Sequence, residues 1–219
     1  YTWFGSSVAS GGDINNDGYD DVVVGAPWGD FDPRGRVYVF WGGRNMDTIP
    51  DLIIFGEGDE WLGRQVNITG DVNRDGFDDF VALGGNSANS RGVHLYFGDS
   101  IINTPQELRF TSDVNSVHFG ITGTGKGDIN GDGFYDIIIS DWGDSTGGIE
   151  DAGRVFVYYG GVEMDNIPDI SLSRGLYRDV FGADLCLAGD INKDGYDDIF
   201  VSAPRYYPEL NEVVWYFGG

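Results

Sequence analysis

The stretch GDINNDGYDD, Gly12 to Asp21, sets the architecture of this chain, because the chain contains it four times. It returns as GDVNRDGFDD from Gly70, GDINGDGFYD from Gly127 and GDINKDGYDD from Gly189. Every copy follows the pattern D-x-N-x-D-G-aromatic-x-D. Oxygen-bearing side chains at alternate positions, with a glycine at position 6 that permits a sharp turn, are typical of a loop around calcium. A solvated acidic turn is the plainer alternative, and four copies with one internal spacing weigh against it.

The spacing of the last acid separates this loop from the better-known helical ones. An EF-hand or a dockerin opens with the same residues, continues into a helix and places its last acidic ligand at position 12. Here the acid stands at position 9 and runs directly into short apolar segments, such as VVVGAP at 22–27 and IFVSAP at 199–204. Short β-branched segments ended by turn residues are typical of strands. Each loop is therefore predicted to join two strands.

We expect four calcium ions, one per loop. Each would be bound by the side chains at positions 1, 3, 5 and 9 and by the backbone carbonyl of position 7. The residue at position 8 is expected to point away from the ion, because neighbouring residues of a strand face opposite ways. The expected ligands are Asp13, Asn15, Asp17, Tyr19 and Asp21; Asp71, Asn73, Asp75, Phe77 and Asp79; Asp128, Asn130, Asp132, Phe134 and Asp136; and Asp190, Asn192, Asp194, Tyr196 and Asp198.

Composition excludes several classes of partner. The 219 residues have a formal net charge of −23, which would repel nucleic acids and anionic membranes. No apolar run reaches transmembrane length and no signal peptide is present, so no membrane insertion is expected. Open calcium loops of low affinity would be filled outside cells, where calcium is millimolar, so the chain is expected to be extracellular or on a cell surface.

Catalytic motifs are not found. His94 and His118 share no spacing with a nucleophile or a zinc motif, and GITGTGKG at 120–127 imitates a phosphate loop without the Ser or Thr that should follow its lysine. We therefore expect no enzyme. The one cysteine, Cys186, cannot pair within the chain and is expected to be a small buried hydrophobe.

A second signal organises the chain into repeats. A Phe-Gly or Leu-Gly pair precedes each calcium loop by nine residues, at Phe4, Leu62, Phe119 and Phe181, and the repeat period is 57 to 62 residues. Each repeat is predicted to be a four-stranded antiparallel meander, and meanders packed radially bury faces that one alone cannot. The fold class is thus all-β, a β-propeller, in a single domain over 1–219 with repeats at about 4–61, 62–118, 119–180 and 181–219.

These residues resemble a known repeat over essentially the whole chain. Phe4-Gly5, the GDINNDGYDD loop, Gly25-Ala26-Pro27 and GRVYVF at 35–40 together are similar to the FG-GAP repeat of integrin α-subunit propellers and their bacterial relatives. The second and third copies depart from Gly-Ala-Pro, with LGG at 83–85 and SDW at 140–142. The resemblance implies four FG-GAP blades. Integrin propellers have seven, so a closed four-bladed ring and a part of a longer propeller both stay open.

The fourth blade is expected to lack its outer strand. Its third strand, VVWYF at 213–217, would then leave an apolar edge that soluble proteins normally cover. We expect self-association, a flanking domain or further blades to complete it.

The predicted function is a calcium-stabilised extracellular recognition or adhesion module. It would bind protein or carbohydrate through the propeller face opposite the calcium loops, where exposed aromatic side chains stand among polar ones. A structural repeat unit of a surface assembly or filament is the alternative, and an accessory domain of a carbohydrate-active enzyme is less favoured. The candidate ligand-face residues are Trp28, Phe31, Arg34, Arg91, Trp142, Arg205, Tyr206 and Tyr207.

Overall fold

The structure, a computed structural model, describes residues 3–29, 32–85, 92–100, 105–111, 118–122, 126–204, 212–216 and 218–219. The regular structure in these residues is extended, apart from one turn of 3-10 helix at Thr146–Gly148. No helix in the described ranges has the length and apolar character needed to span a membrane. The chain divides into two compact units, Tyr1–Thr111 and Ser112–Gly219, and each has its own hydrophobic core.

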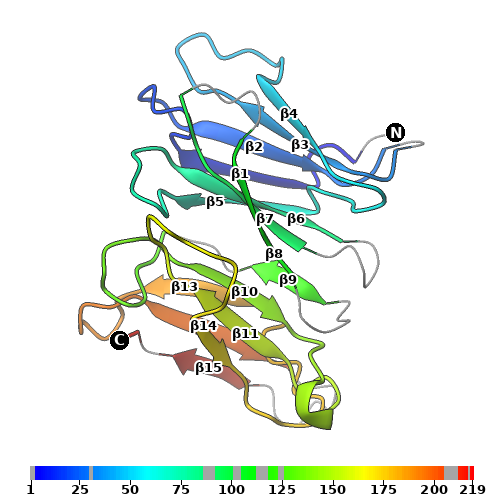
Figure 1. Ribbon diagram of the computed structural model, residues 1–219, viewed down its shortest axis with the longest axis vertical. Coiled ribbons are helices and arrows are strands. Elements are labelled where there is room, and N and C mark those ends of the chain that lie inside the picture. Colours follow the sequence, from blue (N-terminus) through cyan, green and yellow to red (C-terminus); the bar gives the residue numbers. More distant parts are fainter. Residues whose placement is uncertain are drawn as a thin grey trace. The chain divides into compact units, whose positions relative to one another are not determined.

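The first unit contains two antiparallel sheets of four strands, each connected in simple up-and-down order (Figure 1). The first sheet consists of β1 (Ser7–Gly12), β2 (Asp21–Ala26), β3 (Arg36–Phe40) and β4 (Leu52–Phe55). The second consists of β5 (Gln65–Gly70), β6 (Asp79–Gly84), β7 (Gly92–Tyr96) and β8 (Glu107–Phe110). Both are the meanders that the repeat pattern predicts.

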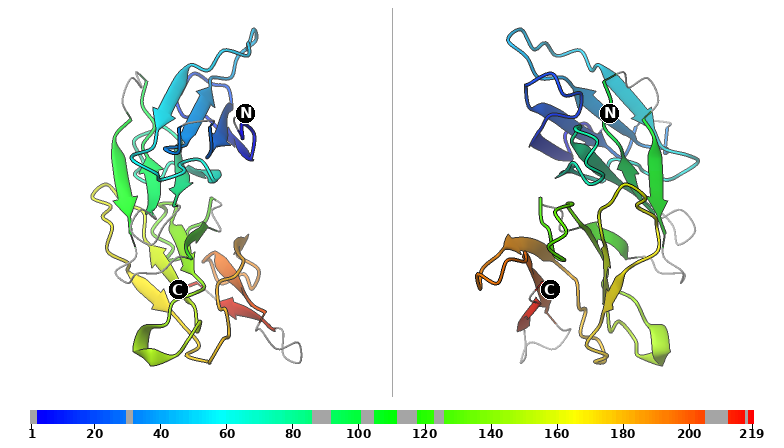
Figure 2. Two further views of the ribbon diagram at one scale, coloured as in Figure 1. Left: turned by 90° about the vertical axis from the view of Figure 1, so that its right-hand side faces the viewer. Right: turned by 60° about the vertical axis from the view of Figure 1, so that its left-hand side comes forward.

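The second unit repeats this arrangement, and each of its sheets can be followed in both views of Figure 2. The third sheet consists of β9 (Phe119–Thr122), β10 (Ile137–Asp141), β11 (Arg154–Tyr158) and β12 (Ile170–Leu172). The fourth consists of β13 (Leu185–Gly189), β14 (Asp198–Ala203) and β15 (Glu212–Tyr216). The prediction of an all-β chain of four antiparallel meanders, the last with three strands, is confirmed. The prediction of a single domain over 1–219 stays a prediction.

Packing between sheets gives each unit its core. In the first unit Val23 and Val39 are register partners on one face of the first sheet, and they pack against Val66 and Phe80 of the second. All four side chains are buried. Burial of a valine or phenylalanine side chain contributes roughly 1.5–3 kcal/mol, so one unsupported sheet would lose most of its stabilisation. This is why the meanders occur in packed pairs.

A β-bulge ends the first strand of three sheets, directly before the candidate calcium loop. The pairing register shifts between Ser10 and Gly12 in β1, and at the equivalent places in β5 and β13. A bulge bends its strand and re-aims the residues that follow. It therefore directs the chain out of the sheet and into the loop.

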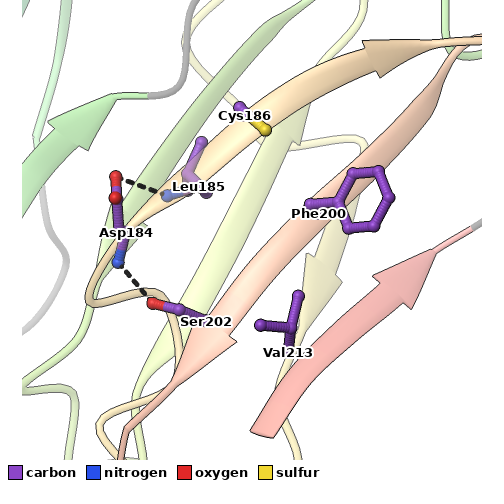
Figure 3. Close-up of a pocket in the computed structure, with 6 residues that line it drawn as sticks. All are labelled: Asp184, Leu185, Cys186, Phe200, Ser202 and Val213. Atoms are coloured by element: carbon purple, nitrogen blue, oxygen red, sulfur yellow. Dashed lines mark hydrogen bonds between the residues drawn. The ribbon is translucent and has the colours of Figure 1, made fainter.

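The expectation for Cys186 is wrong. Its neighbours Leu185 and Leu187 pack against the core of the second unit, and strand alternation turns Cys186 to the other face. The thiol is unpaired and exposed (Figure 3). Alternating apolar residues indicated one buried face correctly, but they did not reveal that the opposite face of this sheet is open.

Candidate metal loops

Each candidate calcium loop is the turn between the first and second strands of its sheet. Residues 13–20 join β1 to β2, residues 71–78 join β5 to β6, and residues 190–197 join β13 to β14. In the third repeat the loop from 128 to 136 leads into β10. Antiparallel connection places these turns at one end of the strands and the turns between second and third strands at the other end. The structure thus brings each predicted ligand set together on one turn.

Side chains at positions 1, 3 and 5 fold over the loop and bind its backbone amides. In the first repeat the two carboxylate oxygens of Asp13 accept the N–H groups of Asp17 at 2.9 Å and Gly18 at 2.8 Å. Asn15 Oδ1 accepts the N–H of Asp17 at 3.0 Å, and Asp17 Oδ1 accepts the N–H of Tyr19 at 3.0 Å. The same bonds recur in the other three loops, with one exception. In the third loop Asp128 Oδ1 does not accept the N–H of Asp132.

Backbone conformation explains two positions of the motif. The glycine at position 6 has a φ between 88° and 98° in all four copies, which confirms the sharp turn expected there. Position 4 also has a positive φ in every copy, in Asn16, Arg74, Gly131 and Lys193. Non-glycine residues in this region are strained, and surrounding bonds must hold them there. The side-chain-to-amide bonds of positions 1, 3 and 5 supply that restraint.

The acid at position 9 has a structural role that the sequence did not reveal. The carboxylate of Asp21 is buried, and its oxygens accept the N–H of Ile14 at 2.8 Å and of Gly42 at 2.7 Å. Asp79, Asp136 and Asp198 make the equivalent pair of bonds. Each therefore ties the start of its loop to a glycine two residues after the end of the third strand. Each oxygen keeps a second lone pair for a cation.

Burial disfavours the charged form of this acid. It raises the pKa of Asp21 to about 6, of Asp136 to about 7 and of Asp79 to about 8. The two amide donors at each carboxylate lower the pKa, and the nearby acids at positions 5 and 1 raise it further. The buried negative charge of these carboxylates can be neutralised by a proton, which is why their pKa values are raised. A cation bound beside them would neutralise the same charge without a proton.

In the second and fourth repeats the acid at position 8 points away from its own loop, as predicted, and it binds the loop of the preceding repeat. Asp78 Oδ2 accepts the N–H of Asp13 at 3.0 Å, and Asp197 Oδ2 accepts the N–H of Asp128 at 2.9 Å. The backbone N–H of Asp78 also donates to the carbonyl of Asp13 at 3.1 Å. In the third repeat Tyr135 stands at this position and cannot accept in the same way. Position 8 therefore links the two blades within each unit.

The residues present fit a cation, although the described residues hold no preformed cluster for one. No group of three or more His, Cys, Asp or Glu side chains in the described part of the chain is arranged to hold a metal. One oxygen nevertheless points to a ligand. Asp128 Oδ1 is buried and has no hydrogen-bond partner among the described residues, and a buried unsatisfied carboxylate oxygen is costly. The donors of all four loops are oxygens, which suit calcium.

Three of the eight candidate ligand-face residues lie in the described ranges. Trp28 is in contact with Trp61, at a ring-centroid distance of 4.8 Å, and with Trp3, at 6.3 Å. Arg34 is bound to Asp32 at 2.9 Å. Trp28 and Arg34 belong to the connection between β2 and β3, at the end of the first sheet away from its calcium loop. Sequence reasoning missed Asp32, which anchors both Arg34 and Arg36.

The remaining candidates belong to the second unit or lie outside the described residues. Trp142 belongs to the second unit and stacks on the ring of His118 with centroids 3.5 Å apart. The other five candidates, Phe31, Arg91, Arg205, Tyr206 and Tyr207, lie outside the described residues.

A buried charged cluster in the second blade was also missed. His94 on β7 is held between Glu60, at 2.8 Å from Nε2, and Glu107, at 2.6 Å from Nδ1. Arg109 binds the same oxygen of Glu60 at 2.8 Å. Burial acts to lower the pKa of His94, but the hydrogen bonds to Glu107 and Glu60 raise it overall. For Glu60, burial acts to raise the pKa, and the bond and charge of His94 lower it overall.

Comparison with known proteins finds the same repeat. The family model of the FG-GAP repeat matches residues 4–40 and 181–216, which carry the first and last calcium loops. Among curated proteins, the chain is similar to integrin alpha-5 of Xenopus laevis, with 32% identity over 162 residues. It is 34% identical to integrin alpha-7 of Mus musculus over 152 residues.

The longest of these similarities is to integrin alpha-4 of Xenopus laevis, 30% identical over 217 residues, or 92% of this chain. The alpha-5 and alpha-7 matches cover 66% and 65% of the chain. The chain spans 12% to 20% of the length of these three relatives. The similarity is therefore to one region of much longer proteins.

Proposed function

The chain is an FG-GAP repeat protein whose β-propeller blades resemble those of integrin α-subunits, and from this premise we propose that it is a calcium-stabilised extracellular recognition or adhesion module. It would bind protein or carbohydrate through the ends of the blades opposite the calcium loops. The observation that carries the proposal is the separation of the two ends of the first sheet. One end holds a loop of oxygen donors, and the other exposes tryptophans.

Calcium would be held by the four loops. The proposed ligands are the side chains at positions 1, 3, 5 and 9 and the carbonyl at position 7, which for the third loop are Asp128, Asn130, Asp132, Asp136 and Phe134. Bound calcium supplies a positive charge that neutralises several crowded carboxylates at once. The chain's own contribution is the restrained loop, in which backbone amides of Gly133 and Phe134 bind the carboxylates of Asp128 and Asp132.

The ligand end is proposed on the tryptophans of the first unit. Trp3 and Trp28 are exposed beside Trp61, and the Asp32–Arg34 ion pair is close in sequence to Trp28. Large flat rings with polar neighbours provide contact area at little entropic cost, which suits a protein hot spot or the face of a sugar ring. Catalysis is not proposed, because His94 is enclosed between two glutamates and is buried.

Binding to arrays tests this proposal. The chain, loaded with calcium, is applied to panels of extracellular-matrix proteins and of glycans, and the Trp28→Ala variant is compared with it. We expect at least one panel member to be retained and its affinity to fall by about tenfold or more in the variant. Ile49→Ala is the matched control, because Ile49 is exposed on the turn at the calcium end. Retention that survives Trp28→Ala, or no retention on either panel, would contradict the proposal.

A further inference from the structure

The turn that joins the first two sheets carries a residue in a strained conformation. Residues 56–64 connect β4 to β5 at the end of the blades away from the calcium loops. Trp61 on this turn has a φ of 58°, in a region that bulky residues rarely adopt. Strained backbone of this kind persists only where the surrounding contacts hold it in place. The contacts around Trp61 therefore decide the shape of the turn.

Backbone bonds tie this turn to the connection between β2 and β3. The N–H of Trp61 donates to the carbonyl of Pro33 at 3.1 Å. The N–H of Leu62 donates to the carbonyl of Arg34 at 2.9 Å. The same connection carries Trp28, whose ring meets the ring of Trp61 edge-on with centroids 4.8 Å apart. The indole N–H of Trp61 is buried and has no acceptor among the described residues. A buried donor without a partner costs free energy, so contacts elsewhere on the turn must hold the ring in this position.

Glu60, the residue before Trp61, is buried and joins the turn to the second sheet. Its Oε1 lies 2.8 Å from Nε2 of His94 and accepts a hydrogen bond from Arg109 at 2.8 Å. Its Oε2 accepts the backbone N–H of Glu57, within the turn, at 3.0 Å. One buried side chain therefore connects the backbone of the turn to β7 and to β8.

The second unit has a similar arrangement at the equivalent place. Asp179 comes two residues before the Phe of its Phe-Gly pair, as Glu60 comes two residues before the Leu of its Leu-Gly pair. The Asp179 side chain is fully buried and is paired with Arg174 at 3.5 Å. The next residue, Val180, has a φ of 55°, an outlier for a β-branched residue. A buried acid followed by a residue in a left-handed conformation thus occurs in both units, which indicates that the acid restrains the turn.

Charge strengthens the bonds of Glu60. Both ring nitrogens of His94 face carboxylates, Nε2 that of Glu60 and Nδ1 that of Glu107. Ionised carboxylates only accept hydrogen bonds, so the two bonds together require the doubly protonated ring. Burial acts to lower the pKa of His94, and the bonds to Glu107 and Glu60 raise it overall. The guanidinium of Arg109 is always charged. Glu60 is therefore held by two cationic donors, and such charge-assisted bonds are about twice as strong as neutral ones.

We propose that Glu60 is a positioning residue of the ligand end. Its bonds to His94 and Arg109 fix the turn, and the turn holds the ring of Trp61 against Trp28. This role rests on the proposed function, which places the ligand at the tryptophans. Glu60 itself is buried and does not touch the ligand. The second sheet thereby sets the geometry of a binding surface that is otherwise built on the first sheet.

Fluorine NMR of the full chain, labelled with fluorotryptophan and loaded with calcium, tests this role without a ligand. The lines of Trp61, Trp28 and Trp41 are assigned by replacing each residue with Phe. Glu60→Gln keeps the size of the side chain and removes its charge, so the lines of Trp61 and Trp28 should shift or broaden. The line of Trp41 should stay in place, because Trp41 follows β3 at the calcium end of the same sheet, where its N–H is bound by Asp51.

Two further variants separate positioning from a general loss of stability. Glu107→Gln is the matched control, because Glu107 binds His94 on the nitrogen that faces away from Glu60, and the Trp61 line should stay in place. Arg109→Met removes one of the two cationic donors to Glu60 at a side chain that is 35% exposed. It should move the Trp61 line as Glu60→Gln does, and it decides the matter if Glu60→Gln does not fold. A Trp61 line that stays in place in both variants, or a Trp41 line that moves with it in both, would overturn the positioning role.

Binding to the panels of matrix proteins and glycans gives a second measure. Any member that the native chain retains should bind Glu60→Gln about two- to tenfold more weakly, because an unrestrained side chain must be ordered when the ligand binds. Equal affinity of the native chain and Glu60→Gln would overturn the role of Glu60. The absence of any retained member would contradict the proposed function, and the fluorine lines of the free chain would still decide whether Glu60 positions Trp61.

Discussion

Asp78 and Asp13 are 65 residues apart in sequence, and the carboxylate of Asp78 accepts the backbone N–H of Asp13 at 3.0 Å. The same bond joins Asp197 to Asp128. In the second and fourth repeats the position-8 acid thus fastens the preceding loop to its neighbour, whereas the acids at positions 1 and 5 bind amides within their own loop. The two roles can be separated by mutation.

Asp78→Ala is expected to destabilise the first unit by about 1–3 kcal/mol, because it leaves the N–H of Asp13 without its acceptor in a partly buried contact between the first two sheets. The loss should be the same in calcium and in chelator, since Asp78 binds a neighbouring loop. Chemical denaturation measures it. Asp20→Ala is the matched control, because Asp20 is the same residue of the motif with an exposed side chain, and at low protein concentration it should be neutral. A cost confined to calcium would assign Asp78 to metal binding instead.

Asp75→Ala, in contrast to Asp78→Ala, should reduce stability mainly when calcium is present. Asp75 is at position 5 of the second loop, where its side chain binds the N–H of Phe77 and is proposed to bind calcium. The variant should lose one of four calcium sites in calorimetry and should lose stability mainly in calcium. At a calcium concentration of about 100 Kd, one site contributes about 2.7 kcal/mol. An unchanged site count would remove Asp75 from the ligand set.

Removal of calcium should lower the melting temperature strongly. Each ion would bind the folded loop and not the unfolded chain, so stability follows free calcium by mass action. Without it, each loop gathers like charges that oppose folding. Calorimetry is expected to find four ions per chain, with magnesium competing poorly because its small octahedral shell suits a rigid site with fewer oxygens. Fewer than three ions per chain, or identical melting curves in calcium and in chelator, would contradict the calcium proposal.

In chelator, stability should fall as pH rises. The pKa values of Asp21, Asp136 and Asp79 are raised above 3.8 to about 6, 7 and 8. A raised pKa means that the folded state binds the proton more tightly, so its stabilisation is complete below pH 3.8 and is lost as pH rises through 6 to 8. Asp79→Asn, which cannot ionise, should reduce the slope. In calcium the trend should reverse, because acid protonates the carboxylates and displaces the cation. A flat profile in chelator would contradict the burial argument.

The His94 cluster predicts a second pH dependence, independent of calcium. The pKa of His94 is raised above 6.5, so its contribution is full below pH 6.5 and is lost as pH rises through the folded value. The pKa of Glu60 is lowered below 4.5, so its contribution is present above pH 4.5 and is lost in acid. The difference in unfolding free energy between the native chain and His94→Gln should therefore be largest between pH 4.5 and 6.5. Breaking a buried ion cluster costs about 3–5 kcal/mol.

Glu107→Gln offers the matched comparison for this cluster. Glu107 binds the other nitrogen of His94 and is more exposed than Glu60, so its removal should cost less. Equal unfolding free energies of the native chain and His94→Gln at all pH values would show that the ion cluster contributes nothing to stability.

Local chemistry determined most of what the sequence predicted correctly. Three features of the sequence act locally: the glycine at position 6, the alternating oxygens and the short β-branched segments. Together they predicted four loops that each join two strands. The Phe-Gly spacing then fixed the repeat, and the repeat required sheets that pack in series. The loops and the repeated meanders do not depend on where one sheet lies against another, and both are present in the structure.

Packing between sheets decided the rest. The partner of Asp78, the enclosure of His94 by Glu60 and the exposure of Cys186 depend on contacts between repeats, which no local pattern contains. The carboxylate of Asp21 looks like a fifth ligand in sequence, but folding also buries it between two amides from Ile14 and Gly42. Alternation along a strand shows that two faces differ. Only the tertiary structure shows which of them is covered, because burial depends on the neighbour that each face meets.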